Sequence, residues 1–201
     1  MESILIIGGA GYVGTELQKH LALKSYKVSV FDTYWYSDGR WDKTESDFAQ
    51  RITYLKGDVR DKFVLEKALR GIDTVIHLAC ISNDPSYELN PRLSKEVNFD
   101  SFATFLELLN VSQVKNLIYA SSSSVYGVKS EPEVTEDLIC EPRTDYSKFK
   151  VLCEAMIKER LNPNINRTVL RPSTVCGYSK RQRFDLVVNI LTIQALTTKQ
   201  I

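Results

Sequence analysis

The sequence predicts an α/β fold, built as a doubly wound parallel sheet with helices on both faces. Branched apolar residues run through Ile4-Leu5-Ile6-Ile7 without alternation, which is typical of a parallel strand covered on both faces. The run stops at a cluster of glycines, and a helical pattern follows. Strand-like and helix-like segments then alternate along the chain, as a doubly wound sheet requires.

Composition limits the class of protein. The 201 residues suffice for one domain with a sizeable core. The 26 basic and 25 acidic residues leave a formal net charge of +1, so we expect neither nucleic acid nor a membrane surface as a partner. We expect no signal peptide, because the N-terminus leads straight into a strand, and no apolar run approaches the ~20 residues of a membrane span. The cysteines lack metal-site spacing and suit a reducing cytoplasm, with no metal expected; they are Cys80, Cys140, Cys153 and Cys176.

The glycine cluster after the first strand has the spacing of a dinucleotide-binding turn. It reads G-x-x-G-x-x-G from Gly8 and G-x-G-x-x-G from Gly9. Glycine lets the backbone approach a ligand where a Cβ would collide, and the helix that follows points unpaired N–H groups at the same place. A pyrophosphate fits there. We therefore expect a Rossmann-type site with cofactor contacts from Gly8, Gly11, Tyr12, Val13 and Gly14.

The second strand, residues 27–31, ends at Asp32, close to the expected distance of about 20 residues. A carboxylate there accepts both hydroxyls of an adenosine ribose and repels a 2′-phosphate. This favours NAD over NADP; the alternative is that Asp32 only caps a loop. Thr33 is a further expected contact. The aromatic residues of loop 33–41 either cover the adenosine or form a satellite cluster on the domain.

The third and fourth strands are expected to complete the cofactor side. After residues 52–55, Asp58 is placed to recognise an adenine amino group and Val59 to lie against the ring, although a helix N-cap by Asp61 explains part of this stretch. The fourth strand, residues 74–79, should end beside the cofactor, because ligands of open α/β sheets lie outside the carboxyl ends of the strands. The contacts expected there are Leu78, Ala79 and Cys80.

Two polar residues stand among apolar neighbours. His77 is better interpreted as a hydrogen-bonded core residue than as a catalyst. Asn98 lies in a helix predicted over residues 92–109, where a buried amide needs a partner; we place it among the cofactor contacts, with nearby strand-end backbone as one candidate partner. This helix has more apolar residues than one buried face needs, so its second face is a candidate homodimer surface.

A tyrosine and a lysine near the start of a later helix are candidates for catalysis. Tyr146 and Lys150 lie four residues apart and share one helix face. A phenol with a pKa near 10 is a poor base at neutral pH, but an adjacent ammonium lowers that pKa. The serines 121–124 follow the fifth strand, residues 116–120, and one of them would hold the reacting hydroxyl. Alone, Tyr-x-x-x-Lys is common on helices and predicts nothing; its place after the glycine turn and Asp32 gives it meaning.

Together these segments resemble the extended short-chain dehydrogenase/reductase family, and within it the NAD-dependent epimerases and dehydratases of nucleotide sugars. The resemblance covers nearly the whole chain. The residues that carry it are Gly8, Gly11 and Gly14; Asp32; Gly57-Asp58-Val59; His77-Leu78-Ala79; Ser121 to Gly127; Tyr146 with Lys150; and Leu170-Arg171-Pro172.

The resemblance implies a catalytic triad. Ser122 is then its hydroxyl, Tyr146 the base, and Lys150 the partner that tunes the base and bonds the nicotinamide ribose. Further cofactor contacts are implied at Ser121 and Pro172. The implied reaction is a hydride loan: Tyr146 removes a hydroxyl proton while the sugar carbon gives hydride to NAD, the keto sugar rotates, and hydride returns to its other face.

The resemblance also bears on the substrate. Dehydratases of the family carry Asp and Glu after the triad hydroxyl, whereas Ser123 and Ser124 stand here, which favours epimerisation. Residues 181–189 resemble the substrate-side loop and helix, in which Arg183 would pair with a diphosphate or, alternatively, lie on a solvated cationic loop. The implied substrate contacts are Ser122, Ser123, Arg183 and Asn189.

Family members continue beyond this point into a small domain that closes over the nucleotide sugar. We therefore expect residues 1–178 to form the NAD-binding domain and residues 179–201 the start of a truncated substrate-binding region. Two other functions stay open. One is a non-catalytic NAD-binding module that reports cofactor state to a partner, and the other is a nucleotide-sugar dehydratase or reductase.

Overall fold

The computed structural model describes residues 1–36, 40–41, 47–82 and 84–200. One sheet of six parallel strands has the order β3-β2-β1-β4-β5-β6, which confirms the predicted doubly wound fold. The strand order reverses between β1 and β4, and a ligand crevice is expected at that point. The strands are β1 Ser3–Ile7, β2 Lys27–Asp32, β3 Ile52–Lys56, β4 Thr74–His77, β5 Asn116–Ala120 and β6 Asn166–Leu170.

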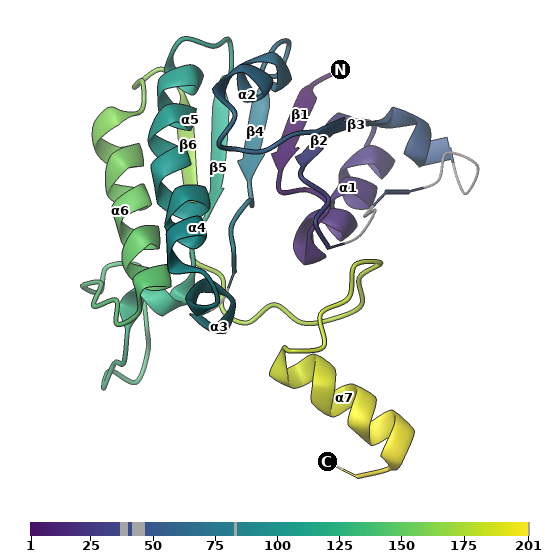
Figure 1. The fold of residues 1–201 in the computed structure, drawn as a ribbon, viewed down its shortest axis with the longest axis vertical. Helices are drawn as coiled ribbons and strands as arrows, with labels where there is room; N and C mark the ends of the chain where they lie inside the picture. Colours follow the sequence, from purple (N-terminus) through teal and green to yellow (C-terminus); the bar gives the residue numbers. More distant parts are fainter. Residues whose placement is uncertain (37–39, 42–46, 83, 201) are drawn as a thin grey trace.

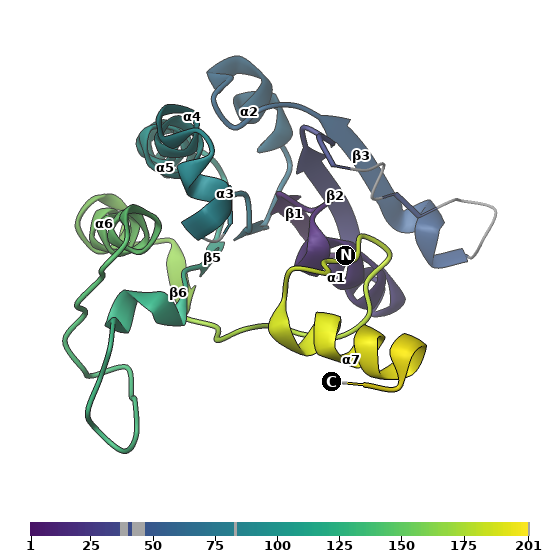
Figure 2. The ribbon, with the colours of Figure 1, turned by 60° about the horizontal axis from the view of Figure 1, so that its bottom comes forward.

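Helices cover both faces of the sheet, although unequally. In Figures 1 and 2, α2, α5 and α6 lie on one face and α1 lies on the other. The helical segments are α1 Tyr12–Leu23, η1 Asp47–Arg51, α2 Lys62–Ala68, α3 Asp84–Glu88, α4 Pro91–Lys95, η2 Glu96–Asp100, α5 Ser101–Asn110, η3 Ser123–Tyr126, α6 Asp145–Arg160 and α7 Val187–Thr198. Asp61 caps α2 by accepting hydrogen bonds from the N–H groups of Phe63 and Val64, as predicted.

Each central strand contributes to two hydrophobic cores. Leu5 and Ile7 of β1 belong to the larger core with residues of α2, α5 and α6, while Ile4 and Ile6 belong to the core beneath α1. Side chains alternate between the faces of a strand, so a strand with two covered faces is apolar throughout. This is the physical reason for the unbroken apolar run from which the fold is predicted.

The helix predicted over residues 92–109 is formed by three segments in succession. A π-helical turn, η2, separates α4 from α5. Figure 1 shows α5 between α2 and α6, and its residues Phe102, Phe105 and Leu109 are all buried within the monomer. Its apolar residues therefore pack against two neighbouring helices within the monomer, and the homodimer stays a prediction.

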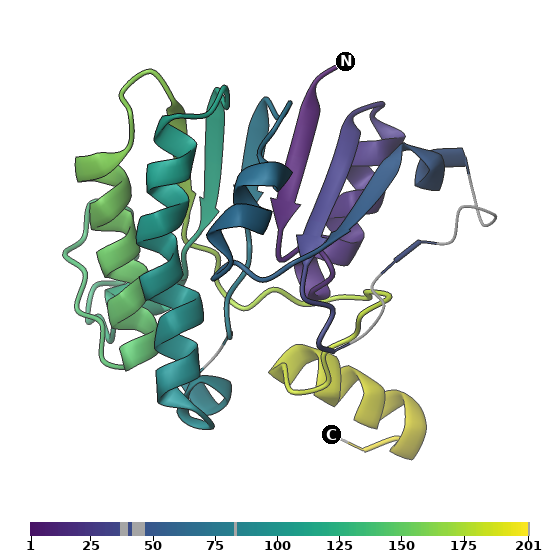
Figure 3. The same ribbon diagram turned by 45° about the horizontal axis from the view of Figure 1, so that its top comes forward.

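The chain after β6 is arranged differently. It crosses the carboxyl ends of the strands, and α7 stands below them, away from the sheet (Figures 1 and 3). A polar anchor on α1 holds this segment: the Tyr12 hydroxyl donates to the Gly177 carbonyl at 2.6 Å and accepts from Asn189 Nδ2 at 3.0 Å. Ser179 Oγ donates to the Tyr12 carbonyl at 2.8 Å.

Candidate functional site

A cavity of about 870 Å³ opens at the carboxyl ends of β1, β2 and β4. Its volume lies in the range of small-molecule and cofactor sites. Its wall contains most of the predicted cofactor contacts, namely Gly8, Gly11, Tyr12, Val13, Gly14, Asp32, Thr33, Asp58, Val59, Leu78, Ala79, Cys80 and Pro172. In the part of the chain that the structure describes, no group of three His, Cys, Asp or Glu is placed to hold a metal ion.

The turn between β1 and α1 is built for close approach. Gly8 has a φ of +80°, and a Cβ there would lie 2.5 Å from the backbone of Ala79. A Cβ on Gly14 would lie 2.5 Å from the carbonyl oxygen of Gly9. Gly11 caps α1 without a side-chain hydrogen bond, which leaves the first N–H groups of the helix for a ligand. The turn therefore fits the pyrophosphate of a dinucleotide.

Asp32 is held in place at the end of β2. Its Oδ2 accepts a hydrogen bond from Ala10 N, and its Oδ1 accepts one from Tyr34 N, both at 2.9 Å. Each carboxylate oxygen has further lone pairs, so the side chain is oriented and can still accept from ribose hydroxyls. Its negative charge at the cavity wall opposes a 2′-phosphate.

The aromatic loop has two roles. Tyr34, Trp35 and Tyr36 line the cavity, as expected of a cover for the adenosine. Trp41 instead packs edge-on against Phe48 at 5.4 Å and donates its indole N–H to the Thr15 carbonyl at 3.0 Å, as expected of a satellite cluster. The satellite-cluster alternative therefore holds for Trp41, and the covering of the adenosine by the other rings stays a prediction. Residues 37–39 of this loop lie outside the described residues.

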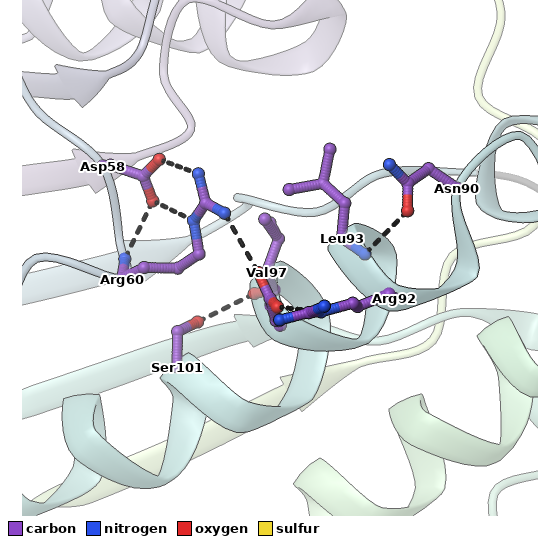
Figure 4. A network of polar contacts seen from close by, with 8 residues as sticks. Asp58, Arg60, Asn90, Arg92, Leu93, Val97 and Ser101 are labelled. Atoms are coloured by element: carbon purple, nitrogen blue, oxygen red, sulfur yellow. Dashed lines mark hydrogen bonds and ion pairs between the residues drawn. The ribbon is translucent and has the colours of Figure 1, made fainter.

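Asp58 belongs to a polar network just after β3 (Figure 4). Arg60 binds its carboxylate through two bonds, Nη2 to Oδ2 at 2.7 Å and Nε to Oδ1 at 3.0 Å, and also reaches Glu96 Oε2 at 3.2 Å. Hydrogen bonding from Arg60 lowers the pKa of Asp58. The carboxylate stays ionised, which suits an acceptor for an amino group. Arg60 was not predicted from the sequence, in which Asp-x-Arg after a strand was the only signal.

Asn98 acts on the site through the backbone. The π-helical turn η2 places its side chain against Ile81, where Oδ1 accepts from Ile81 N at 2.7 Å and Nδ2 donates to Ile81 O at 3.0 Å. Ile81 lines the cavity. The structure thus gives Asn98 a partner at the end of β4, as a buried amide requires, and its direct contact with the cofactor stays a prediction.

Three side chains come together beside the cavity: Ser122, which caps η3, and Tyr146 and Lys150 of α6. Lys150 is buried, and its Nζ donates to the Ala120 carbonyl at 2.7 Å and lies 5.7 Å from the centre of the Tyr146 ring. The Ser122 hydroxyl accepts hydrogen bonds from the Ser124 N–H at 3.2 Å and the Ser124 hydroxyl at 2.9 Å, and it lies near enough to the Tyr146 phenol to lower its pKa. Ala120 and Cys80 are in the cavity wall, so the phenol, ammonium and hydroxyl lie at its edge, although none of the three lines the cavity itself.

The protonation of Tyr146 differs from the expectation. The sequence predicts that Lys150 lowers its pKa, whereas the structure gives a pKa raised above the usual value. Burial of the phenol is the largest cause, followed by the nearby thiol of Cys80. The Ser122 hydrogen bond and the charge of Arg183 act in the lowering direction but are outweighed.

The neighbouring serines have other partners. Ser121 Oγ donates to Glu154, which also pairs with Arg171 at 2.6 Å. The Ser123 backbone N–H donates to the Pro172 carbonyl at 2.9 Å. These contacts tie the end of β5 to α6 and to the segment after β6. Ser121 therefore contributes to the frame of the site, and the ligand contacts expected of Ser121 and Ser123 stay predictions.

The expected substrate residues lie on the segment after β6. Arg183 lines the cavity, pairs with Asp185, and donates to Ser82 Oγ at 3.1 Å. Asn189 is buried, and its side-chain amide bonds only within the protein. Its Oδ1 accepts from Gly177 N at 3.0 Å, and its Nδ2 donates to the Tyr12 hydroxyl and, at 2.9 Å, to the Arg183 carbonyl. The structure therefore shows Asn189 as an anchor, and its contact with substrate stays a prediction.

Several residues of the wall were not predicted individually as ligand contacts, although residues 181–189 were expected on the substrate side. They come from the segments after β4 and β6, including the start of α3 and of α7, where position at the strand ends was the signal. They are Ile81, Ser82, Pro85, Ser86, Thr174, Val175, Arg181, Asp185, Leu186 and Val187.

Comparison with known proteins gives a consistent result. The model of the NAD dependent epimerase/dehydratase family matches residues 4–200. The chain is 30% identical over 179 residues to a UDP-glucose 4-epimerase of Lactobacillus helveticus, covering 88% of this chain and 52% of that protein. It is 32% identical over 185 residues to the N-acetyl-alpha-D-glucosaminyl-diphospho-ditrans,octacis-undecaprenol 4-epimerase of Escherichia coli O157:H7, covering 90% and 51%.

A solved structure extends the likeness to the fold. The UDP-glucuronic acid 4-epimerase of Bacillus cereus, in complex with UDP-glucuronic acid and NAD, superposes with a TM-score of 0.79 at 28% identity, covering 96% of this chain and 63% of that one. The chain spans about half the length of the curated relatives it matches.

Proposed function

Because this chain belongs to the NAD-dependent epimerase/dehydratase family, we propose that it is the cofactor-binding part of a nucleotide-sugar epimerase that uses NAD. One observation carries the proposal. A glycine turn suited to pyrophosphate and a fixed Asp32 line the same cavity whose edge holds Ser122, Tyr146 and Lys150. Sugar 4-epimerases among the relatives support this choice of reaction.

The chain's own residues would divide the work as follows. The N–H groups at the start of α1 bind the pyrophosphate, and Asp32 accepts the ribose hydroxyls. When bound, NAD would supply the exchange of hydride and a positive charge near the phenol. Tyr146 takes the proton of a sugar hydroxyl, and Ser122 orients that hydroxyl. Lys150 places its charge against the Tyr146 ring.

The raised pKa of Tyr146 sets a requirement on catalysis. A buried neutral phenol is a weak base, so nearby positive charge must offset the effect of burial before the proton can leave. Lys150 and Arg183 supply that charge from opposite elements, α6 and the loop before α7. Ser123 and Ser124 provide no carboxyl group for elimination of water, which favours epimerisation over dehydration.

Replacing the phenol tests the proposal. Tyr146→Phe should reduce interconversion of UDP-glucose and its 4-epimer by at least about 10³-fold, because the proton acceptor is lost, and should leave NAD affinity unchanged in calorimetry. Tyr178→Phe is the matched control, since Tyr178 is exposed. A Tyr146→Phe protein of undiminished rate would remove the catalytic assignment.

The same measurements address the alternatives. If the protein is a non-catalytic NAD-binding module, both the wild type and Tyr146→Phe would bind NAD and neither would turn over substrate. A reductase would consume reduced cofactor stoichiometrically, whereas an epimerase regenerates it. Absorbance of the reduced nicotinamide during turnover separates these two cases.

The proposal also extends to the cellular location and the oligomeric state of the protein. Among the described residues, no helix has the length and apolar character to cross a bilayer. We place the protein in the cytoplasm, as a homodimer serving polysaccharide biosynthesis. The relative that acts on an undecaprenol-linked sugar supports the last point. Sedimentation equilibrium tests the dimer, and a monomer at high concentration would contradict it.

A further inference from the structure

We propose that Arg181 binds the pyrophosphate of the dinucleotide, with its guanidinium held in position by the ring of Tyr36. The inference rests on the proposed function, because it names a further contact of the same NAD site. Arg181 lies on the segment between β6 and α7, and Tyr36 lies on the loop after β2. Both residues line the cavity, so the pair joins two parts of its wall that are far apart in the sequence.

The contact between the two side chains leaves the donors of the arginine available. Arg181 Cζ lies over the Tyr36 ring, 4.7 Å from its centroid. This attraction uses the charge of the guanidinium and the electrons of the ring, and it needs no N–H group. The N–H groups form a rigid fork that matches two oxygens of a phosphate. The ring therefore positions the guanidinium without occupying the part of it that binds an anion.

The guanidinium has no acceptor of its own in the protein. Among the residues that the structure describes, Arg181 is bonded only through its backbone N–H, which donates to Ser179 Oγ at 3.3 Å. The carboxylate of Asp185, four residues further on, pairs with Arg183 instead. An arginine carries five N–H donors and no acceptor. At a cavity wall, such a side chain is suited to an anionic ligand.

Hydrogen bonds place Arg181 beside the glycine turn. Ser179 Oγ donates to the Tyr12 carbonyl at 2.8 Å, and the Lys180 N–H donates to Glu16 Oε1 at 3.2 Å. Tyr12 and Glu16 belong to the first part of α1, where the N–H groups suited to a pyrophosphate lie. The residues on either side of the Ser179–Lys180 pair are therefore held against the start of this helix, and Arg181 is the next residue along the chain.

The segment that carries the arginine is also fixed internally. Gln182 Oε1 accepts from Ser179 N at 2.9 Å, and its Nε2 donates to the Gly177 carbonyl at 3.2 Å. A side chain on a pre-ordered segment loses less conformational entropy on binding than one on a loose segment. The arrangement is therefore prepared to receive a ligand at little cost in order.

The balance of charge in the cavity requires a cation. Each phosphate of the dinucleotide carries a negative charge, whereas the start of a helix offers roughly half of a positive charge. Asp32 adds a further negative charge to the same wall. Among the described residues that line the cavity, the arginines and lysines are Arg181 and Arg183, and Arg183 is paired with Asp185. Arg181 therefore supplies the positive charge that the pyrophosphate lacks.

The test measures binding of ADP-ribose to the 201-residue chain by calorimetry, because this probe carries the pyrophosphate and no 2′-phosphate. Arg181→Gln should weaken binding at least about tenfold in about 0.05 M NaCl, since hydrogen bonds to a charged group are lost. The loss should be clearly smaller in about 0.5 M NaCl, where salt screens the charge. Arg167→Gln removes the same charge from an exposed position on β6, and should leave the affinity unchanged.

Substitutions of Tyr36 test its positioning role. Tyr36→Phe keeps a ring beside the guanidinium and should bind ADP-ribose as the wild type does. Tyr36→Leu should weaken binding in the wild type but add little to the loss in Arg181→Gln, because the ring acts through the arginine. Fully additive losses would overturn the role given to Tyr36.

The outcomes at Arg181 are also decisive. Unchanged affinity for ADP-ribose in Arg181→Gln would overturn the inference and leave the NAD site standing. A loss of equal size at both salt concentrations would make Arg181 a structural residue and would also overturn it. A wild-type protein that does not bind ADP-ribose would count against the proposed function itself, and the inference would fall with it.

Discussion

The centre of the sheet and its β6 edge differ in how completely they are covered. In β1, a central strand, Ile4 to Ile7 are almost wholly buried between two layers of helices. At the β6 edge, only Val169 is half-buried and Leu170 is 50% exposed. The cofactor side of the crevice is therefore fixed by packing, whereas the side that carries Arg183 depends on a few polar anchors.

Some residues of the crevice are therefore positioned by packing of the core, and others by a few hydrogen bonds. Gly8, Asp32 and Ala79 are positioned by strands whose side chains fill two cores. Arg183 and α7 are positioned mainly through Tyr12, Ser179 and Asn189. Substitutions at the centre of the sheet should therefore lower the free energy of unfolding, and substitutions beside the β6 edge should mainly change self-association and ligand binding.

The largest effect is expected at Gly8. Gly8→Ala introduces left-handed strain of about 1–2 kcal/mol and a clash with Ala79 that costs about 1–3 kcal/mol more. Gly71 has a similar φ of +74° but no atoms within 4 Å of a Cβ, so Gly71→Ala isolates the strain. Urea unfolding of both variants measures the difference, and equal losses would refute the tight-packing claim.

Cofactor choice should follow Asp32. We expect the protein to bind NAD at least about 100-fold more tightly than NADP, because the carboxylate repels a 2′-phosphate. Asp32→Ser should narrow that gap. Asp61→Ser, which removes a charge from the exposed cap of α2, should not. Calorimetric titration with both dinucleotides measures the ratio of the two affinities in each protein. Equal affinities in the wild type would remove the role given to Asp32.

His77 should make the covered core sensitive to acid. Burial lowers its pKa from 6.5 to about 3, with its ring packed between Phe102, Phe105 and Tyr119. Below pH 6.5 the unfolded chain binds a proton that the folded chain does not, so stability falls as the pH drops towards 3. The loss at pH 5 is about 2 kcal/mol.

The variant His77→Phe keeps an aromatic ring in this place and should remove that part of the pH dependence in urea unfolding between pH 5 and 7. His20→Gln, at an exposed position, should retain it. An unchanged pH slope in His77→Phe would show that other groups cause the acid sensitivity.

The smallest effect on stability is expected on α7. Leu196 is 67% exposed, so Leu196→Lys should change the free energy of unfolding by less than about 0.5 kcal/mol, against about 2–5 kcal/mol for Leu65→Ala in the core. Exposed apolar side chains of α7 should make the chain self-associate, and Leu196→Lys should weaken that in light scattering. A variant that unfolds readily would mean that α7 is packed in solution.

The fold was predictable because every central strand shows its two covered faces as an apolar run. The glycine turn and Asp32 were predictable because their chemistry needs particular residues at a particular spacing. Convergence of Tyr146, Lys150 and Ser122 was predictable only through resemblance, since Tyr-x-x-x-Lys is common on helices.

The remaining features depend on distances that no pattern contains. The raised pKa of Tyr146 results from burial by neighbouring elements. The anchor between Tyr12 and Asn189 joins opposite ends of the chain. The helical period does not reveal that η2 winds as a π-helix, so the way in which Asn98 reaches Ile81 was not foreseeable.

The Tyr12 anchor has a consequence for the order of folding. It joins Tyr12 to Gly177 and to Asn189, which are separated from it by 165 and 177 positions along the chain. Contacts of such separation form late, because closing a long loop costs entropy. The strands and the glycine turn can assemble first. The wall of the crevice that bears Arg183 is then added last, so a newly made chain completes the glycine turn before it closes the opposite wall of the crevice.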